Sequence, residues 1–212
     1  MEFQAVVFDL DGVICFTDEY HYQAWKAMAD KLEIPFDRIV NNRLRGVSRM
    51  ASLEIILENY TGPALSEEDK LALATEKNEL YRELLGQMSP ADLSDEVKDT
   101  LDELRRRGYQ LAIGSSSKNA PFILRQIGLE GYFDAVSDGN NITRSKPDPE
   151  VFLKAAEMLS LPPEACLVVE DAVSGAEAAH AGGMKAACVG DAAKNGAGDY
   201  NMSGVPELLT IL

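Results

Sequence analysis

The sequence has few basic residues, few cysteines and no long apolar run. Lys and Arg number 20 against 35 Asp and Glu, a net charge of −15, which disfavours nucleic acid and anionic lipid as partners. Three cysteines, Cys15, Cys166 and Cys188, are too few and too scattered for a disulfide framework or a zinc site. No stretch approaches the roughly eighteen apolar residues of a membrane span, and the N-terminus lacks the pattern of a signal peptide. We therefore expect a cytoplasmic protein.

The composition is that of an ordinary globular protein. Hydrophobic residues make up 46% and charged residues 26% of 212 residues, which excludes disorder, collagen and coiled coil. This length is enough for one buried core and a second small unit.

Short apolar runs alternate with helical patterns along most of the chain. Runs that end in turn signals predict strands buried on both faces, and they lie at 4–8, 110–114, 133–137, 165–169 and 185–189. Helical patterns lie at 95–107, 119–127, 150–159 and 173–181, and glycine follows several of them. The alternation predicts an α/β fold with a Rossmann-like, mainly parallel sheet, and a loop at 191–204.

The segment after the first run breaks this rhythm. About eighty residues with helical patterns at 18–32, 48–59 and 66–85 precede the next strand, whereas a parallel crossover needs only about a dozen. The pattern predicts an inserted α-helical domain at 15–91 and a core domain formed by 1–14 and 92–212.

Polar residues follow the predicted strands where the strands end. Ligands of open α/β sheets bind at this edge, and carboxylates that converge there repel one another unless a cation is present. Because the ligands are oxygens, the cation should be Mg²⁺, and hydroxyls with free N–H groups at a helix start suit a phosphate. The residues expected at this edge are Asp9, Asp11, Ser115, Ser116, Ser117, Lys146, Glu170 and Asp171.

Each of these motifs also has a simpler explanation. Asp-Gly is most often a turn, a serine run is usually a helix N-cap, Lys-Pro is usually surface, and Glu-Asp often begins a helix. Each simpler explanation is favoured when its motif is taken singly. All four at one sheet edge, in a chain with a helical insert, predict a site.

The order Asp-x-Asp-Gly, Ser, Lys-Pro, Glu-Asp resembles the haloacid dehalogenase superfamily over essentially the whole chain. The resemblance implies that the insert is the α-helical cap domain of that superfamily. The resemblance implies phosphoryl transfer, with Asp9 as the nucleophile that becomes an aspartyl phosphate and Asp11 as the acid/base. It implies that Ser115 and Lys146 bind the phosphoryl oxygens. It also implies an Mg²⁺ site.

The implied Mg²⁺ ligands are Asp9, Asp171 and the backbone carbonyl of Asp11, supported by Glu170 directly or through water.

Two patterns in the insert leave alternatives open. His21 and Trp25 lie on one helical stripe, so His21 is either a packed core histidine or a functional one. The segment Arg45-Gly46-Val47-Ser48-Arg49 is either a solvated loop or a second phosphate clamp, because arginine offers a planar fork matched to phosphate. Lys77 and the pair Lys118-Asn119 either face the same cavity or lie on the surface.

A narrower resemblance lies in segments of both cap and core: Thr17, Glu19-Tyr20-His21, Trp25, Arg45–Arg49 with Ser52, Lys77-Asn78, Ser89-Pro90-Ala91-Asp92 and Ser115–Asn119. These segments resemble those of the β-phosphoglucomutases of this superfamily. This resemblance implies interconversion of the small-molecule sugar phosphates β-glucose 1-phosphate and glucose 6-phosphate through β-glucose 1,6-bisphosphate. It implies that Thr17 and His21 couple activation of Asp11 to sugar binding, and that Arg49 holds the non-reacting phosphate. The implied substrate-binding residues are Trp25, Arg45, Gly46, Val47, Ser48, Arg49, Ser52, Lys77, Ser116, Ser117, Lys118 and Asn119. Phe16 departs from the polar residue usual at its linker position.

Two other functions stay open from the sequence. One is a sugar-phosphate phosphatase of the same superfamily, in which water takes the phosphoryl group from Asp9. The other is a non-enzymatic binding protein on the same scaffold. We expect a monomer.

Overall fold

A computed structural model describes residues 3–45 and 47–212 of the chain. Its centre is a six-stranded sheet in the order β3-β2-β1-β4-β5-β6, in which every neighbouring pair is parallel. The strands are β1 (Ala5–Phe8), β2 (Gln110–Gly114), β3 (Ala135–Ser137), β4 (Cys166–Glu170), β5 (Lys185–Cys188) and β6 (Tyr200–Asn201). The predicted α/β fold with a parallel sheet is confirmed.

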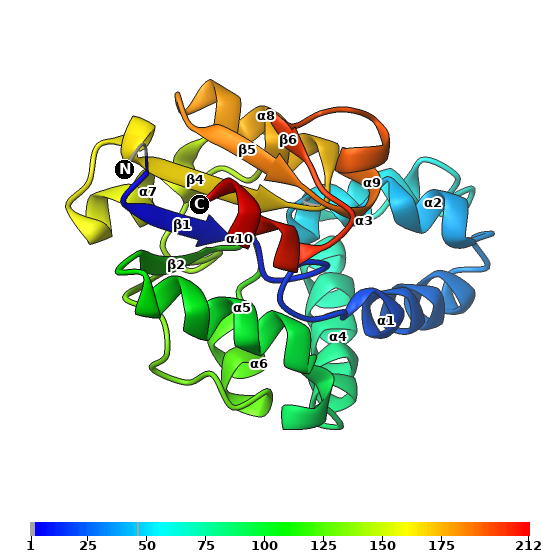
Figure 1. Cartoon of the computed structure of the whole chain (residues 1–212). Helices are drawn as coiled ribbons and strands as arrows, with labels where there is room; N and C mark the ends of the chain where they lie inside the picture. The colour runs from blue at the N-terminus through cyan, green and yellow to red at the C-terminus, as the bar shows by residue number, and fades with distance from the viewer. Residues whose placement is uncertain (1–2, 46) are drawn as a thin grey trace.

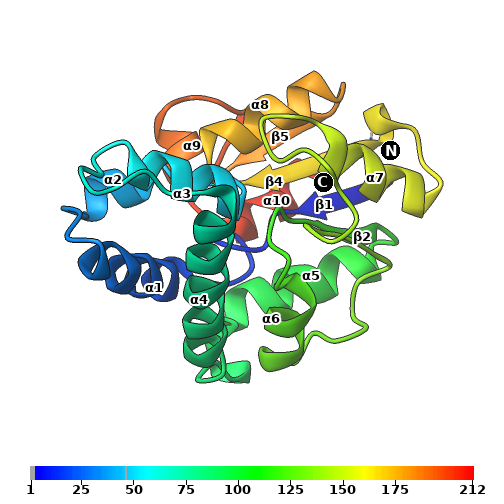
Figure 2. The same ribbon diagram turned by 180° about the vertical axis from the view of Figure 1, so that it is seen from behind.

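Helices cover both faces of this sheet (Figures 1 and 2). On one face lie α5 (Asp95–Arg106), α6 (Ala120–Gln126) and α10 (Leu208–Ile211); on the other lie α7 (Glu150–Leu159) and α8 (Val173–Ala181). Alternate residues of β1 point to opposite faces, so Val6 and Phe8 join one core and Ala5 and Val7 the other. Burial of these runs on both sides explains why they are apolar without alternation.

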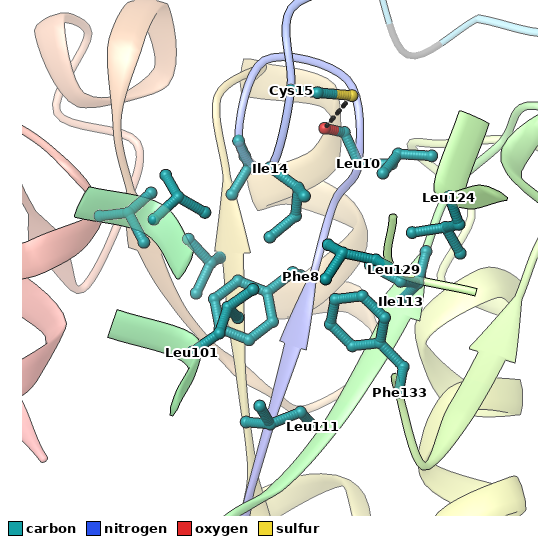
Figure 3. Packing of buried hydrophobic residues seen from close by; sticks show 14 of the residues in the cluster. Phe8, Leu10, Ile14, Cys15, Leu101, Leu111, Ile113, Leu124, Leu129 and Phe133 are labelled. Atoms are coloured by element: carbon teal, nitrogen blue, oxygen red, sulfur yellow. Dashed lines mark hydrogen bonds between the residues drawn. The ribbon is translucent and has the colours of Figure 1, made fainter. Parts of the chain in front are cut away.

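Figure 3 shows the larger core around Phe8. Leu101 of α5 and Ile113 of β2 pack there with Phe133, whose ring centroid lies 6.5 Å from that of Phe8. The same cluster includes Tyr81 and Leu85 near the end of α4 (Glu67–Leu85), so apolar packing attaches this helix of the insert to the sheet layer.

The long segment between β1 and β2 is helical, as predicted. It contains α1 (Asp18–Lys31), α2 (Arg38–Asn42), α3 (Arg49–Leu57) and α4. A separate apolar cluster joins these helices, among them Trp25, Leu53 and Ala74. A capping box begins α4, since the Ser66 side chain accepts the Asp69 N–H and the Asp69 side chain accepts the Ser66 N–H. That these helices form a domain with boundaries at residues 15 and 91 stays a prediction.

Short elements differ from the sequence-based expectation. Helix α2 was not predicted, and the predicted loop at 191–204 is wrong in part, because it holds most of α9 (Gly190–Lys194) and all of β6. β6 consists of two residues that pair with β5, so it depends on a neighbouring strand rather than on a local pattern. Three short 3₁₀ turns, η1 (Pro90–Asp92), η2 (Pro163–Ala165) and η3 (Val205–Glu207), complete the chain.

Sheet topology determines where the polar strand ends meet. β1 is central, and the chain goes to β2 on one side and later to β4 on the other, which makes its carboxyl end a topological switch point. In Figure 1 the arrowheads of β1 and β4 point toward the side of the insert. Among the described residues, no helix is both long and apolar enough to cross a membrane.

Candidate active site

A cavity of about 400 Å³ lies between the carboxyl ends of the strands and the helical insert. Both parts of the chain line it. The predicted site residues in its wall are Asp9, Asp11, His21, Trp25, Arg45, Val47, Ser48, Arg49, Ser52, Lys77, Ser115, Ser116, Ser117, Lys118, Asn119, Lys146, Glu170 and Asp171. Thr17 is buried directly behind Asp11, which accepts its hydrogen bond, and Gly46 lies outside the described residues.

The floor of the cavity holds three carboxylates and one ammonium group. Asp9, Glu170 and Asp171 offer ligand oxygens that all lie within 4.8 Å of one another. Lys146 Nζ donates to Asp9 Oδ1 and to Glu170 Oε1, each at 2.5 Å, and its side chain is 1% exposed. Burial by itself would lower the pKa of Lys146, but Asp9 and Glu170 outweigh it and raise that pKa. Lys146 therefore stays cationic.

The carboxylates repel one another, and one lysine does not balance their charge. Burial raises the pKa of Asp9 well above its usual value, with Lys146 opposing and Glu170 adding to the rise. Burial, with repulsion from Glu170, raises the pKa of Asp171 to about 7. An all-oxygen set with surplus negative charge fits a hard divalent cation such as Mg²⁺, which would remove the repulsion.

Two glycines give these carboxylates their space. A Cβ on Gly175 would lie 2.0 Å from the Glu170 carboxyl group. Gly12 has φ +98°, and a Cβ there would lie 2.3 Å from Asp171 Oδ2. A side chain at either position would push a carboxylate out of the cluster.

Asp11 stands beside this cluster in a different environment. The Thr17 hydroxyl donates to Asp11 Oδ1. Burial raises the pKa of Asp11, while the hydrogen bond from Thr17 and the charge of Lys146 oppose the rise. A carboxyl group whose pKa is raised in this way can hold a proton for part of a reaction cycle, as an acid/base requires.

The serine segment after β2 makes local hydrogen bonds and also lines the cavity. Ser115 Oγ accepts the Ser117 N–H and Ser117 Oγ accepts the Asn119 N–H, each at 3.1 Å. The simpler explanation of a helix N-cap is therefore wrong for these serines, because the N-cap of α6 is Asn119 and no side chain of the described residues caps it; the two serines make local turn hydrogen bonds instead. Ser116 Oγ is buried without a partner among the described residues, and Lys118 is exposed at the cavity wall.

On the insert side, a lysine and a histidine lie against aromatic rings. Lys77 Nζ lies 3.1 Å from His21 Nδ1 and 4.6 Å from the centroid of Trp25, and the His21 ring stacks on Tyr81. Burial, with the charge of Arg49, lowers the pKa of Lys77 to about 7. Burial, with the charge of Lys77, lowers the pKa of His21 well below its usual value. His21 is thus both packed and at the cavity.

The two arginines that the sequence groups into one clamp have different surroundings. Arg45 Nη1 donates to Asp171 Oδ2 at 2.9 Å, and Nη2 pairs closely with Asp18. Arg49 lines the cavity with no carboxylate within ion-pair distance among the described residues, and burial lowers its pKa. An unpaired, partly desolvated guanidinium is suited to an anion.

Between these two arginines, Ser48 Oγ caps α3 by accepting the Ala51 N–H at 3.3 Å.

Some residues that line the cavity were not among the site residues predicted from the sequence. Tyr81 could have been found, because it lies one turn after Lys77 on the same face of α4. Asp18, Leu71 and Ile142 also line the cavity. Nothing in their sequence context distinguishes them from a helix-terminal acid or from ordinary apolar positions.

Comparison with known proteins identifies relatives of this chain in sequence and in structure. The family model for haloacid dehalogenase-like hydrolases matches residues 3–183. β-Phosphoglucomutase of Bacillus subtilis is 42% identical over 88% of this chain and 83% of its own length, and fructose-1-phosphate phosphatase of Escherichia coli is 34% identical over 87% and 95%. The crystal structure of β-phosphoglucomutase from Clostridium difficile superposes with a TM-score of 0.91 at 34% identity, covering 97% of this chain and 93% of that chain. The chain belongs to the haloacid dehalogenase-like hydrolase family and is similar in sequence and structure to its β-phosphoglucomutases.

Proposed function

We propose that this protein is a cytoplasmic, monomeric, Mg²⁺-dependent β-phosphoglucomutase. It interconverts β-glucose 1-phosphate and glucose 6-phosphate through β-glucose 1,6-bisphosphate. The observation that carries the proposal is the distribution of charge in one cavity. Asp9, Lys146 and the acidic cluster lie on its floor, and Arg49, which forms no ion pair within residues 3–45 and 47–212, lies in the wall from the insert. A substrate with a phosphate at each end needs one reacting site and one holding site.

Asp9 and Asp11 carry the group transfer. The phosphoryl group on Asp9 passes to a sugar hydroxyl: the bond from phosphorus to Asp9 breaks, a bond to the sugar oxygen forms, and Asp11 takes the hydroxyl proton. After the bisphosphate reorients, Asp9 attacks its other phosphate, and Asp11 returns the proton to the departing sugar oxygen. The raised pKa of Asp11 supports this double role.

The residues around this pair bind and orient. Lys146 and the hydroxyl or N–H groups of Ser115 and Ser116 hold phosphoryl oxygens, and Arg49 with Lys118 holds the far phosphate. Asp9, Glu170, Asp171 and the Asp11 carbonyl would hold Mg²⁺, which when bound supplies positive charge against the phosphoryl oxygens. Positioning and electrostatics therefore supply most of the catalysis.

The insert is proposed to act as a cap over residues 1–14 and 92–212. Two contacts join its helices to the sheet layer at the cavity: Asn119 Nδ2 donates to Asn78 Oδ1 at 2.9 Å, and Arg45 pairs with Asp171. A closed cap excludes water from the aspartyl phosphate, and an open cap lets the bisphosphate reorient. The chain from Cys15 to Thr17, with Phe16 74% exposed, would be one linker.

Phosphatase activity is the second candidate, because the similar Escherichia coli relative is a fructose-1-phosphate phosphatase. The test supplies β-glucose 1-phosphate, Mg²⁺ and a catalytic amount of the bisphosphate, and follows glucose 6-phosphate and inorganic phosphate together. We expect glucose 6-phosphate as the dominant product and no turnover by Asp9→Asn. Dominant inorganic phosphate would favour the phosphatase, and bound sugar phosphate without turnover would favour a binding protein.

A further inference from the structure

Arg45 links the helical insert to a carboxylate of the acidic cluster. It lies between α2 and α3, whereas Asp171 directly follows β4. The guanidinium bridges two acids, since Nη1 lies 2.9 Å from Asp171 Oδ2 and Nη2 pairs with Asp18 at the start of α1. The Arg45 side chain is 32% exposed and that of Asp171 is 10% exposed, so water screens this contact only in part.

The oxygen that Arg45 contacts has little freedom. Asp171 Oδ2 packs against the backbone of Gly12, where a Cβ would lie only 2.3 Å away. The same carboxyl group belongs to the cluster with Asp9 and Glu170 that fits a divalent cation. The carboxyl group of Asp171 therefore contacts the Arg45 guanidinium at the position where a divalent metal ion would also bind.

We propose that Arg45 is a counter-ion carried by the insert, which competes with the divalent cation for Asp171. Two cations near one carboxylate repel each other, so pairing with Arg45 and metal binding oppose one another. When the insert lies against the sheet layer without metal, Arg45 neutralises part of the cluster. When the insert withdraws, Asp171 is free for the metal. Arg45 is thus a positioning residue for the metal site rather than a phosphate ligand, and this role rests on the metal use in the proposed function.

The test measures Mg²⁺ affinity of the full-length, substrate-free protein by isothermal titration calorimetry. We expect Arg45→Met and Arg45→Gln to bind Mg²⁺ roughly tenfold more tightly than the wild type, the scale for a unit charge near a dication in a partly wet site. Gln keeps a hydrogen-bond donor, so equal gains in both variants would identify charge as the cause.

Arg43→Met is the matched control. Arg43 lies two residues before Arg45 in the sequence and pairs with Glu58 at 2.8 Å on the surface. Its replacement changes the net charge by as much as replacement of Arg45 does, and it should leave the Mg²⁺ affinity unchanged. Unchanged or weaker Mg²⁺ binding by both Arg45 variants would overturn the competition. A wild type that binds no Mg²⁺ would instead overturn the metal requirement of the proposed function, and the competition with it.

Discussion

The buried ammonium group of Lys77 makes a sharp prediction about stability and pH. Lys77 is 4% exposed, has no carboxylate within ion-pair distance among the described residues, and has a pKa lowered by burial to about 7. In the unfolded chain the pKa of a lysine is about 10.4. Between these values the unfolded chain binds more protons than the folded one, so the free energy of unfolding rises with pH.

The size of this effect follows from the two pKa values. Raising the pH from 7 to 10 should increase the contribution of Lys77 to the free energy of unfolding by about 3 to 4 kcal/mol. Lys77→Met removes the titrating group. Between pH 7 and pH 10, the free energy of unfolding of the wild type should therefore rise by this amount relative to that of the variant. The difference between two pH values is the readout, because Met also changes the packing around Trp25.

Urea unfolding followed by tryptophan fluorescence is the assay. Trp25 is the single tryptophan of the chain and its ring centroid lies 4.6 Å from Lys77 Nζ, so its emission reports on this part of the insert. Lys70→Met is the control on the same helix. In the folded protein Glu54 raises the pKa of Lys70, and in the unfolded chain Lys70 has the ordinary lysine pKa of about 10.4, so it stays mostly charged in both states over this range. Parallel stability curves for the wild type and Lys77→Met between pH 7 and 10 would refute the reasoning.

Three further predictions concern the cavity. Gly12→Ala should lose about 1–3 kcal/mol of stability and bind Mg²⁺ more weakly in calorimetry, because backbone strain at φ +98° adds to the clash with Asp171. Gly108→Ala is the control, since Gly108 has φ +89° and nothing lies within 4 Å of its added Cβ, so this variant should lose stability without a change in Mg²⁺ binding. Arg49→Ala should reduce kcat/KM for the bisphosphate by at least about tenfold while sparing a small aryl phosphate, and equal losses on both would count against the holding site. EDTA should abolish turnover and Mg²⁺ should restore it; full activity after exhaustive chelation would contradict the metal requirement.

Local patterns were sufficient for the long elements and for β3, but they failed for other short ones. The buried runs around Phe8 and Val168 were recognisable because strands covered on both faces contain almost no polar residues. Helix α2 and strand β6 were missed because five and two residues hold little more than one period of the helical or the strand pattern, and β6 exists only through its pairing with β5.

By itself, the sequence determined which chemical groups the site contains. The sequence contains the paired Asp9 and Asp11, the Lys-Pro and Glu-Asp motifs and the long helical segment after β1. These features predicted an α/β protein with its polar residues at one sheet edge. Only the tertiary structure decided how those groups pair. Arg45 faces Asp171 across 126 positions of sequence, whereas Arg49 faces the cavity with no carboxylate partner in the described part of the chain. The reason is physical: composition sets which charges are present, but burial and distance set the energy of each charge, and both depend on parts of the chain that meet only after folding.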